Sequence, residues 1–238
     1  MSKFFINCLL DAKYIAIYLC GLLILFFSFE ILLNFVLEYL SETVENISLN
    51  DLFLNSFFPI ALNYTSSLLF SIARELISLI IILYPLVKVI DMFLNYLSSI
   101  LFTKIKRKNW VKALFILIII YTFITCLLLI IIDLIGFYLE TGETISIKVM
   151  IFSFIVRYFM TLSIFSLFMY FAIKMEGLYF GVIFSLSIYI IYSIFINNIF
   201  LTLNRIYFIP FLLINIGLQY LFYITNTLNI EKKDIGGL

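Results

Sequence analysis

The chain has 238 residues, of which 65% are hydrophobic and only 12% charged, with a mean hydropathy of +1.20 and a net charge of +1. Soluble globular proteins carry roughly 25% charged residues and about half apolar ones, and a chain of this length cannot hide so large an apolar surplus from water. The composition therefore excludes a water-soluble domain and predicts an all-α, polytopic integral membrane protein. The small net charge gives no reason to expect nucleic acid as a partner.

Histidine is absent from the sequence. Its absence excludes Ser–His and Cys–His catalysis, HExxH metal sites and haem ligation by histidine. About six spans with short connections would also use nearly the whole chain, since each span needs roughly 20 apolar residues. We therefore expect no enzyme activity, no catalytic residue, no metal and no cofactor in this chain.

The N-terminal residues predict an interfacial helix followed by a first span. Within residues 2–13, Lys3, Asn7 and Asp11 recur every four positions, which is typical of a helix lying in the headgroup layer. A frayed polar start to the first span is the alternative. The apolar run over about 14–38 then predicts the first transmembrane helix.

The second span is expected over about 62–87, followed by a second interfacial helix over about 88–103. Lys88, Asp91 and Asn95 stand at helical spacing in this otherwise apolar stretch, and we expect them to contact a partner. A basic run follows on the same side of the membrane and consists of Lys104, Lys106, Arg107, Lys108 and Lys112. This whole segment could rest on anionic lipid, or a cytosolic ATPase subunit could grip it.

The C-terminal half predicts four further spans, which brings the total to about six in one transmembrane domain, 1–238. Their ranges are about 113–138, 149–173, 178–197 and 207–227. Gly177 and Gly181 form a GxxxG element at the start of the fifth span. Because glycines at this spacing let two helices approach closely, we expect them to serve helix packing.

The distribution of lysine and arginine predicts the orientation. With the N-terminus inside, the internal side collects Lys3, Lys13, Lys88, Lys104, Lys106, Arg107, Lys108, Lys112, Lys174, Lys232 and Lys233. The external side has only Lys148 and Arg205. Since internal loops carry the excess of basic residues, both termini are expected in the cytoplasm and the protein in the cytoplasmic membrane.

Ionisable residues inside the predicted spans form one intramembrane polar layer in the outer half of the bilayer. Its members are Glu30, Arg74, Glu75, Asp133 and Arg157. Charge in hydrocarbon is unfavourable by about 2.5–3.5 kcal/mol per residue on insertion scales, so we expect arginines and glutamates of this layer to pair. The layer could line a cavity that a substrate enters, or it could fix the order of the helices.

The order of parts resembles the membrane subunits of type-2 ATP-binding-cassette exporters, in particular small bacterial permeases for peptide or bacteriocin export and immunity. The likeness is clearest over residues 150–225. There, Leu162-Ser-Ile-Phe-Ser-Leu-Phe-Met-Tyr-Phe-Ala-Ile-Lys-Met-Glu-Gly177 resembles the family's passage from the fourth to the fifth span. Asn204-Arg-Ile-Tyr-Phe-Ile-Pro-Phe211 resembles the segment before its last span.

The resemblance implies a permease subunit that moves a peptide or another amphipathic molecule out of the cell. ATP would be hydrolysed by a separate cytosolic subunit, because nothing in the chain resembles a glycine-rich phosphate loop. Such permeases act as homo- or heterodimers in the lipid bilayer. A membrane scaffold or assembly subunit is the main alternative, and a channel-like component is a third.

Overall fold

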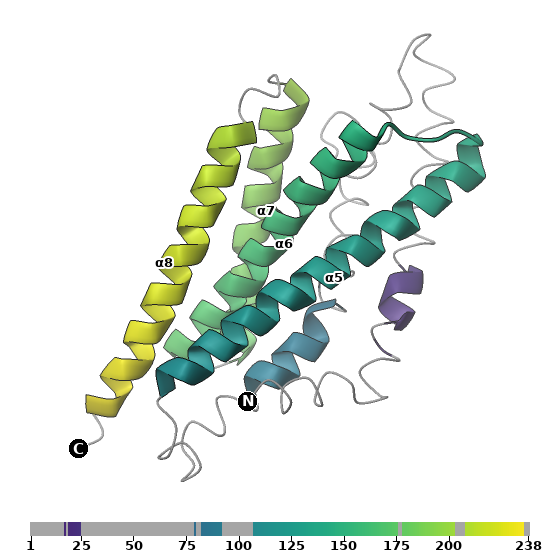
Figure 1. Ribbon diagram of the computed structural model, residues 1–238. Helices are drawn as coiled ribbons and strands as arrows, with labels where there is room; N and C mark the ends of the chain where they lie inside the picture. The colour runs from purple at the N-terminus through teal and green to yellow at the C-terminus, as the bar shows by residue number, and fades with distance from the viewer. Residues whose placement is uncertain are drawn as a thin grey trace.

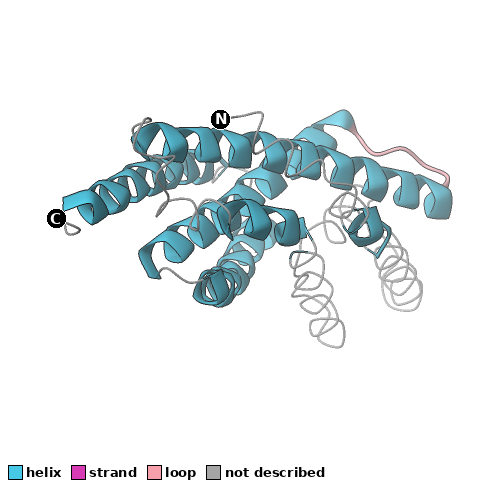
Figure 2. Cartoon of the chain, turned by 90° about the horizontal axis from the view of Figure 1, so that it is seen from below, coloured by secondary structure: helices cyan, strands magenta, loops and turns pink. Residues whose placement is uncertain are grey.

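The computed structural model describes residues 17, 19–24, 79, 82–91, 107–175, 178–202 and 208–235, without the side chains of residues 107, 110, 140, 193–202 and 231–235. Within these ranges every regular element is a helix and there is no strand (Figure 2). The long helices are α5 (Arg107–Thr141), α6 (Ile147–Met175), α7 (Leu178–Thr202) and α8 (Phe208–Ile235). The predicted all-helical class is confirmed for the described part of the chain.

Three of these helices are long and apolar enough to cross a membrane: Val111–Leu139, Ile147–Met175 and Phe208–Ile230, with 29, 29 and 23 residues. At about 1.5 Å per residue they measure roughly 35–44 Å, which exceeds a hydrocarbon layer of about 30 Å. A shorter apolar helix covers Leu178–Tyr192. These lengths and compositions are those of a membrane protein.

The helices alternate in direction, and α6 is the central one because it packs against α5, α7 and α8. In Figure 1, α5 and α7 begin at the lower end of the bundle, where α6 and α8 end, and α5 leans away from α7 and α8 toward its upper end. These are the lower end and, opposite it, the upper end of the bundle. Residues 82–91 lie beside the lower half of α5, where the Tyr121 hydroxyl donates a hydrogen bond to the Ile82 carbonyl at 2.6 Å.

The link between α5 and α6 is short and ends α5 with a defined cap. Gly142 has φ 67°, a left-handed conformation that glycine adopts at little cost, and its N–H donates to the Tyr138 carbonyl at 2.9 Å. Ser146 directly precedes α6 as its N-cap, because its carbonyl accepts hydrogen bonds from the N–H groups of Val149 and Met150. This cap turns the chain back within a few residues, so α5 and α6 are antiparallel neighbours.

Several element boundaries differ from the sequence expectation. Residues 82–91 form one helix through the break predicted between residues 87 and 88, because Val89 and Ile90 are fully buried and continue the apolar core. The helix α5 begins at Arg107, within the basic run and six residues before the predicted 113. At the other end of the chain, α8 continues to Ile235, past the span predicted over about 207–227.

Some predicted features lie outside the described residues. They are the interfacial helix 2–13, most of the spans 14–38 and 62–87, residues 92–103, the side chain of Arg107, and the whole residues Glu30, Arg74, Glu75, Asn95, Lys104, Lys106 and Gly177. Their predicted roles stay predictions.

The helix α7 approaches α6 closely at Gly181. A Cβ atom placed there would lie 3.1 Å from two ring carbons of Phe168 and 3.2 Å from Cβ of Ala172. Both neighbours are fully buried, so neither ring nor backbone can easily move away. On α8, by contrast, Gly217 has nothing within 4 Å of such a Cβ.

We predict that Gly181→Leu lowers the free energy of unfolding by about 1–3 kcal/mol, because the larger side chain overpacks the contact with Phe168 and Ala172. The matched control Gly217→Leu should leave stability within about 0.5 kcal/mol, since that position is exposed. Thermal unfolding of both variants in the same detergent measures the difference. Equal effects of the two substitutions would show that Gly181 is not a packing position.

A candidate functional site inside the helix bundle

The helix α8 turns polar side chains inward and apolar ones outward. Asn215, Gln219 and Asn226 are buried, and Asn215 and Asn226 are 0% exposed. The outward face consists of Ile209, Leu213, Ile214, Ile216, Tyr220, Leu221 and Leu228, which are 48–67% exposed. This arrangement is the reverse of a helix on a water-soluble protein, and it places the hydrogen-bonding groups in the interior of the bundle.

A buried amide network joins α6, α7 and α8 in the middle of the bundle. Its members are Ser163, Ser166, Tyr192, Asn215 and Gln219. The hydroxyls of Tyr192 and Ser163 both donate to Oδ1 of Asn215, at 2.9 Å and 3.1 Å. Nδ2 of Asn215 donates to the carbonyl of Phe211 on its own helix at 2.8 Å. Asn215 therefore connects all three helices through one side chain.

Gln219 extends the network by one turn of α8, since residues four apart share a helix face. Its Nε2 donates to the Ser163 hydroxyl at 3.3 Å, and its Oε1 accepts from Ser166 at 2.5 Å. Ser163 and Ser166 lie nine to twelve residues from Met175 at the end of α6, which is roughly 14–18 Å along the helix. The network is thus roughly midway along α6, a depth at which water in a lipid bilayer could not replace a lost partner.

Three other buried polar side chains in the described part of the chain have no hydrogen-bond partner there: Oγ of Ser153, Oγ1 of Thr161, and both Oδ1 and Nδ2 of Asn226. Most helical hydroxyls in the described ranges behave differently and donate to a carbonyl of their own helix. Thr122, Thr141, Ser185, Ser187, Thr225 and Thr227 do so at 2.7–3.0 Å. The unpartnered groups are therefore positions where a buried polar partner would be favourable.

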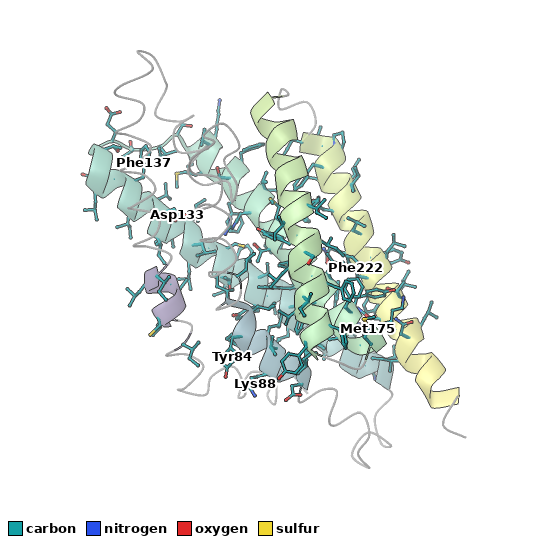
Figure 3. The ribbon with its side chains drawn as sticks, turned by 180° about the vertical axis from the view of Figure 1, so that it is seen from behind. Tyr84, Lys88, Asp133, Phe137, Met175 and Phe222 are labelled. Atoms are coloured by element: carbon teal, nitrogen blue, oxygen red, sulfur yellow. The ribbon has the colours of Figure 1, made fainter. Side chains whose placement is uncertain are left out.

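The two described members of the predicted intramembrane polar layer, Asp133 and Arg157, lie at similar depths. Asp133 is eight residues before Thr141 at the end of α5, and Arg157 is ten residues after Ile147 at the start of α6. At about 1.5 Å per residue these separations correspond to roughly 12 Å and 15 Å from the upper end. Arg157 is buried and Asp133 is partly exposed, and Figure 3 shows Asp133 toward the upper end of α5.

Ser153, Arg157 and Thr161 recur every four residues along α6 and are all at least nine-tenths buried. They form a polar stripe on one side of α6. The amide network contacts a different side, because Thr161 and Ser163 are two residues, or about 200°, apart on the helix. The interior of the bundle thus has two polar surfaces. The side chains of the amide network are hydrogen-bonded to one another, whereas the stripe on α6 contains two hydroxyls without a described partner, those of Ser153 and Thr161.

The lower end of the bundle carries Lys88, Lys108, Lys112 and Lys174, whereas Glu143 and Lys148 flank the start of α6 at the upper end. Figure 3 shows Lys88 at the lower end, together with Met175, the last residue of α6. Lys174 is held against Tyr170, with Nζ 5.4 Å from the ring centre and 3.2 Å from the hydroxyl to which it donates. In the described residues, no three His, Cys, Asp or Glu side chains are close enough to hold a metal ion.

The amide network was not predicted from the sequence, because its members carry no charge and the predicted polar layer consists of ionisable residues alone. A usable signal was present: Asn215 and Gln219 are the amides of an otherwise apolar stretch and are spaced by four. That spacing places both on one helix face. No local pattern in the sequence indicates which helix these amides contact, or that Ser163 is the partner that they share.

We predict that Ser163→Ala lowers the free energy of unfolding by about 1 kcal/mol, because it removes two interhelical hydrogen bonds worth about 0.6 kcal/mol each. Ser187→Ala is the matched control, since Ser187 is exposed and bonds only to the Ile183 carbonyl of its own helix. Denaturation in mixed micelles measures both. A double-mutant cycle with Asn215→Ala should be non-additive; simple additivity would contradict the network.

Comparisons with known proteins bring in no further evidence on the site. A scan against protein-family models, a search of the curated proteins and a search of the solved structures each gave no match to this chain. The functional inference therefore depends on the helices, the buried polar groups and the basic lower end.

Proposed function

We propose that this chain is the permease subunit of an ATP-driven exporter of the cytoplasmic membrane. In this proposal it crosses the membrane about six times, with the lower end of the bundle and both termini in the cytoplasm. It moves a peptide or another amphipathic molecule, and a separate cytosolic subunit hydrolyses ATP. The substrate path passes through the bundle or between two copies of it.

The observation that carries the proposal is the set of buried polar atoms without a partner on Ser153, Thr161 and Asn226. A buried hydroxyl or amide that makes no hydrogen bond costs roughly 1–3 kcal/mol. Polar groups inside membrane bundles commonly mark the routes of substrates and ions. A polar group of a passing substrate would supply the missing partners at these positions.

The lower end offers a surface for the ATPase subunit. Lys88 and Asp91 are partly exposed there, while Leu86, Val89 and Ile90 of the same helix are fully buried. The hydrogen bond from Tyr121 to the Ile82 carbonyl ties this helix to α5. A force applied at Lys88 and Asp91 would therefore be transmitted to a transmembrane helix rather than lost in a loop.

A membrane scaffold is the second candidate, and the amide network favours it. Hydrogen bonds from Tyr192 on α7 and from Ser163 on α6 to Asn215 on α8 hold the three helices together. Such a network fixes helix order without any need for a substrate. The two candidates differ in whether the chain binds an ATPase.

We predict that the full-length chain purified from its own cells carries vanadate-sensitive ATPase activity. Replacement of Lys88, Asp91 and Asn95 by alanine should reduce the co-purified activity at least about tenfold, because the proposed contact surface is lost. The amount of chain in the membrane should not change.

The control for this prediction is Glu143→Ala with Lys148→Ala, which removes exposed charges at the upper end and should leave the ATPase bound. Co-purification of a membrane partner without ATPase activity would contradict the exporter and support the scaffold.

A further inference from the structure

The outward face of α5 is a continuous apolar stripe that ends in two lysines. Ile116, Ile120, Phe123, Leu127, Ile131 and Ile135 follow one another at intervals of three or four residues and are 39–54% exposed. The Phe123 ring also packs edge-on against rings of α6, so this position borders the contact between the two helices. Lys112 and Lys108 continue the same stripe at intervals of four toward the lower end, and both are exposed. The opposite face is buried through Val111, Leu114 and Ile118, so the two lysines must point away from the bundle.

The electrostatic field at this end of the stripe favours an anion. Lys108 and Lys112 both belong to the first two turns of α5, and the first turn contains no acidic residue. The positive end of the helix dipole lies at the same place, because α5 begins at Arg107. The acidic residues of α5, Asp133 and Glu140, are more than 20 residues away.

We propose that Lys108 and Lys112 bind the phosphate of an anionic phospholipid, whose acyl chain lies along Ile116, Ile120 and Phe123. This site depends on the membrane insertion in the proposed function but not on transport or ATP. It assigns a specific ligand to the lower end of α5, where the sequence pattern left lipid and a protein partner open.

The dimensions of the stripe match one leaflet. Lys112 and Phe123 are eleven residues apart, which is roughly 16 Å along the helix. Half of a hydrocarbon layer of about 30 Å is about 15 Å. A headgroup at the lysines would therefore place its acyl chain beside the exposed isoleucines down to the middle of the membrane.

The combination of charge and apolar surface selects a lipid over a soluble anion. A free phosphate would use the lysines alone and leave the exposed stripe without a partner. Lysines at helix ends extend to the headgroup layer while their stems cover apolar surface. Each lysine near an anionic surface contributes a favourable electrostatic interaction, so two on one face should distinguish anionic from zwitterionic lipid.

The experiment is native mass spectrometry of the delipidated full-length chain, titrated with phosphatidylglycerol or phosphatidylcholine that carry the same acyl chains. The native chain should bind phosphatidylglycerol at least about tenfold more tightly. The double variant Lys108→Gln, Lys112→Gln should lower the ratio of the two affinities about tenfold. The double variant Lys108→Arg, Lys112→Arg should retain the ratio of the native chain. Soluble glycerol phosphate should not displace the lipid.

Lys174→Gln is the control at the same end of the bundle, because Lys174 is exposed but held by Tyr170. It should keep the preference for phosphatidylglycerol. Equal loss in Lys174→Gln, an unchanged preference in the double glutamine variant, or displacement by glycerol phosphate would each overturn the site. If the chain selects phosphatidylglycerol but no ATPase co-purifies with it, only the exporter proposal is overturned. If an ATPase co-purifies but the chain does not select phosphatidylglycerol, only the lipid site is overturned.

Discussion

Water is almost absent from the hydrocarbon layer of a membrane, and every hydrogen-bonding group there must find its partner within the protein. This constraint explains why α5 is a helix although it is rich in isoleucine, a β-branched residue with modest helix propensity in water. Only the helix satisfies all backbone groups within one segment. The same constraint explains why Asn215 and Gln219 face the interior of the bundle and meet the hydroxyls of α6.

The helix α6 occupies the central position because different sides of it contact α7 and α8. Ser163 and Ser166 meet α8, while Phe168 and Ala172 receive Gly181 of α7 at a distance that no larger residue fits easily. Close contact and hydrogen bonding thus hold α6, α7 and α8 by two different means. Association of helices in lipid depends on both, because apolar side chains gain little by leaving an apolar solvent.

The two polar surfaces of the interior suggest a division between structure and activity. The hydrogen bonds of the amide network join α6, α7 and α8 and fix the order in which these helices pack. On another side of α6, the hydroxyls of Ser153 and Thr161 remain unpartnered beside the buried Arg157. A satisfied network stabilises the resting bundle, whereas unsatisfied groups retain the capacity to bind. The exporter proposal and the lipid site concern different surfaces, because the stripe with Lys108 and Lys112 faces outward.

The sequence alone predicted the helices of the described part of the chain and their membrane character, since apolar runs of this length satisfy the backbone only as spanning helices. It also indicated the helices later described as α5 to α8, and the basic residues that gather at the lower end. Only the tertiary structure decided that one face of the helix 82–91 is buried beside α5, that Ser163 is shared by Asn215 and Gln219, and that Gly181 meets Phe168. These are contacts between segments up to 56 residues apart, and local periodicity fixes which face a residue occupies but not which neighbour that face will meet.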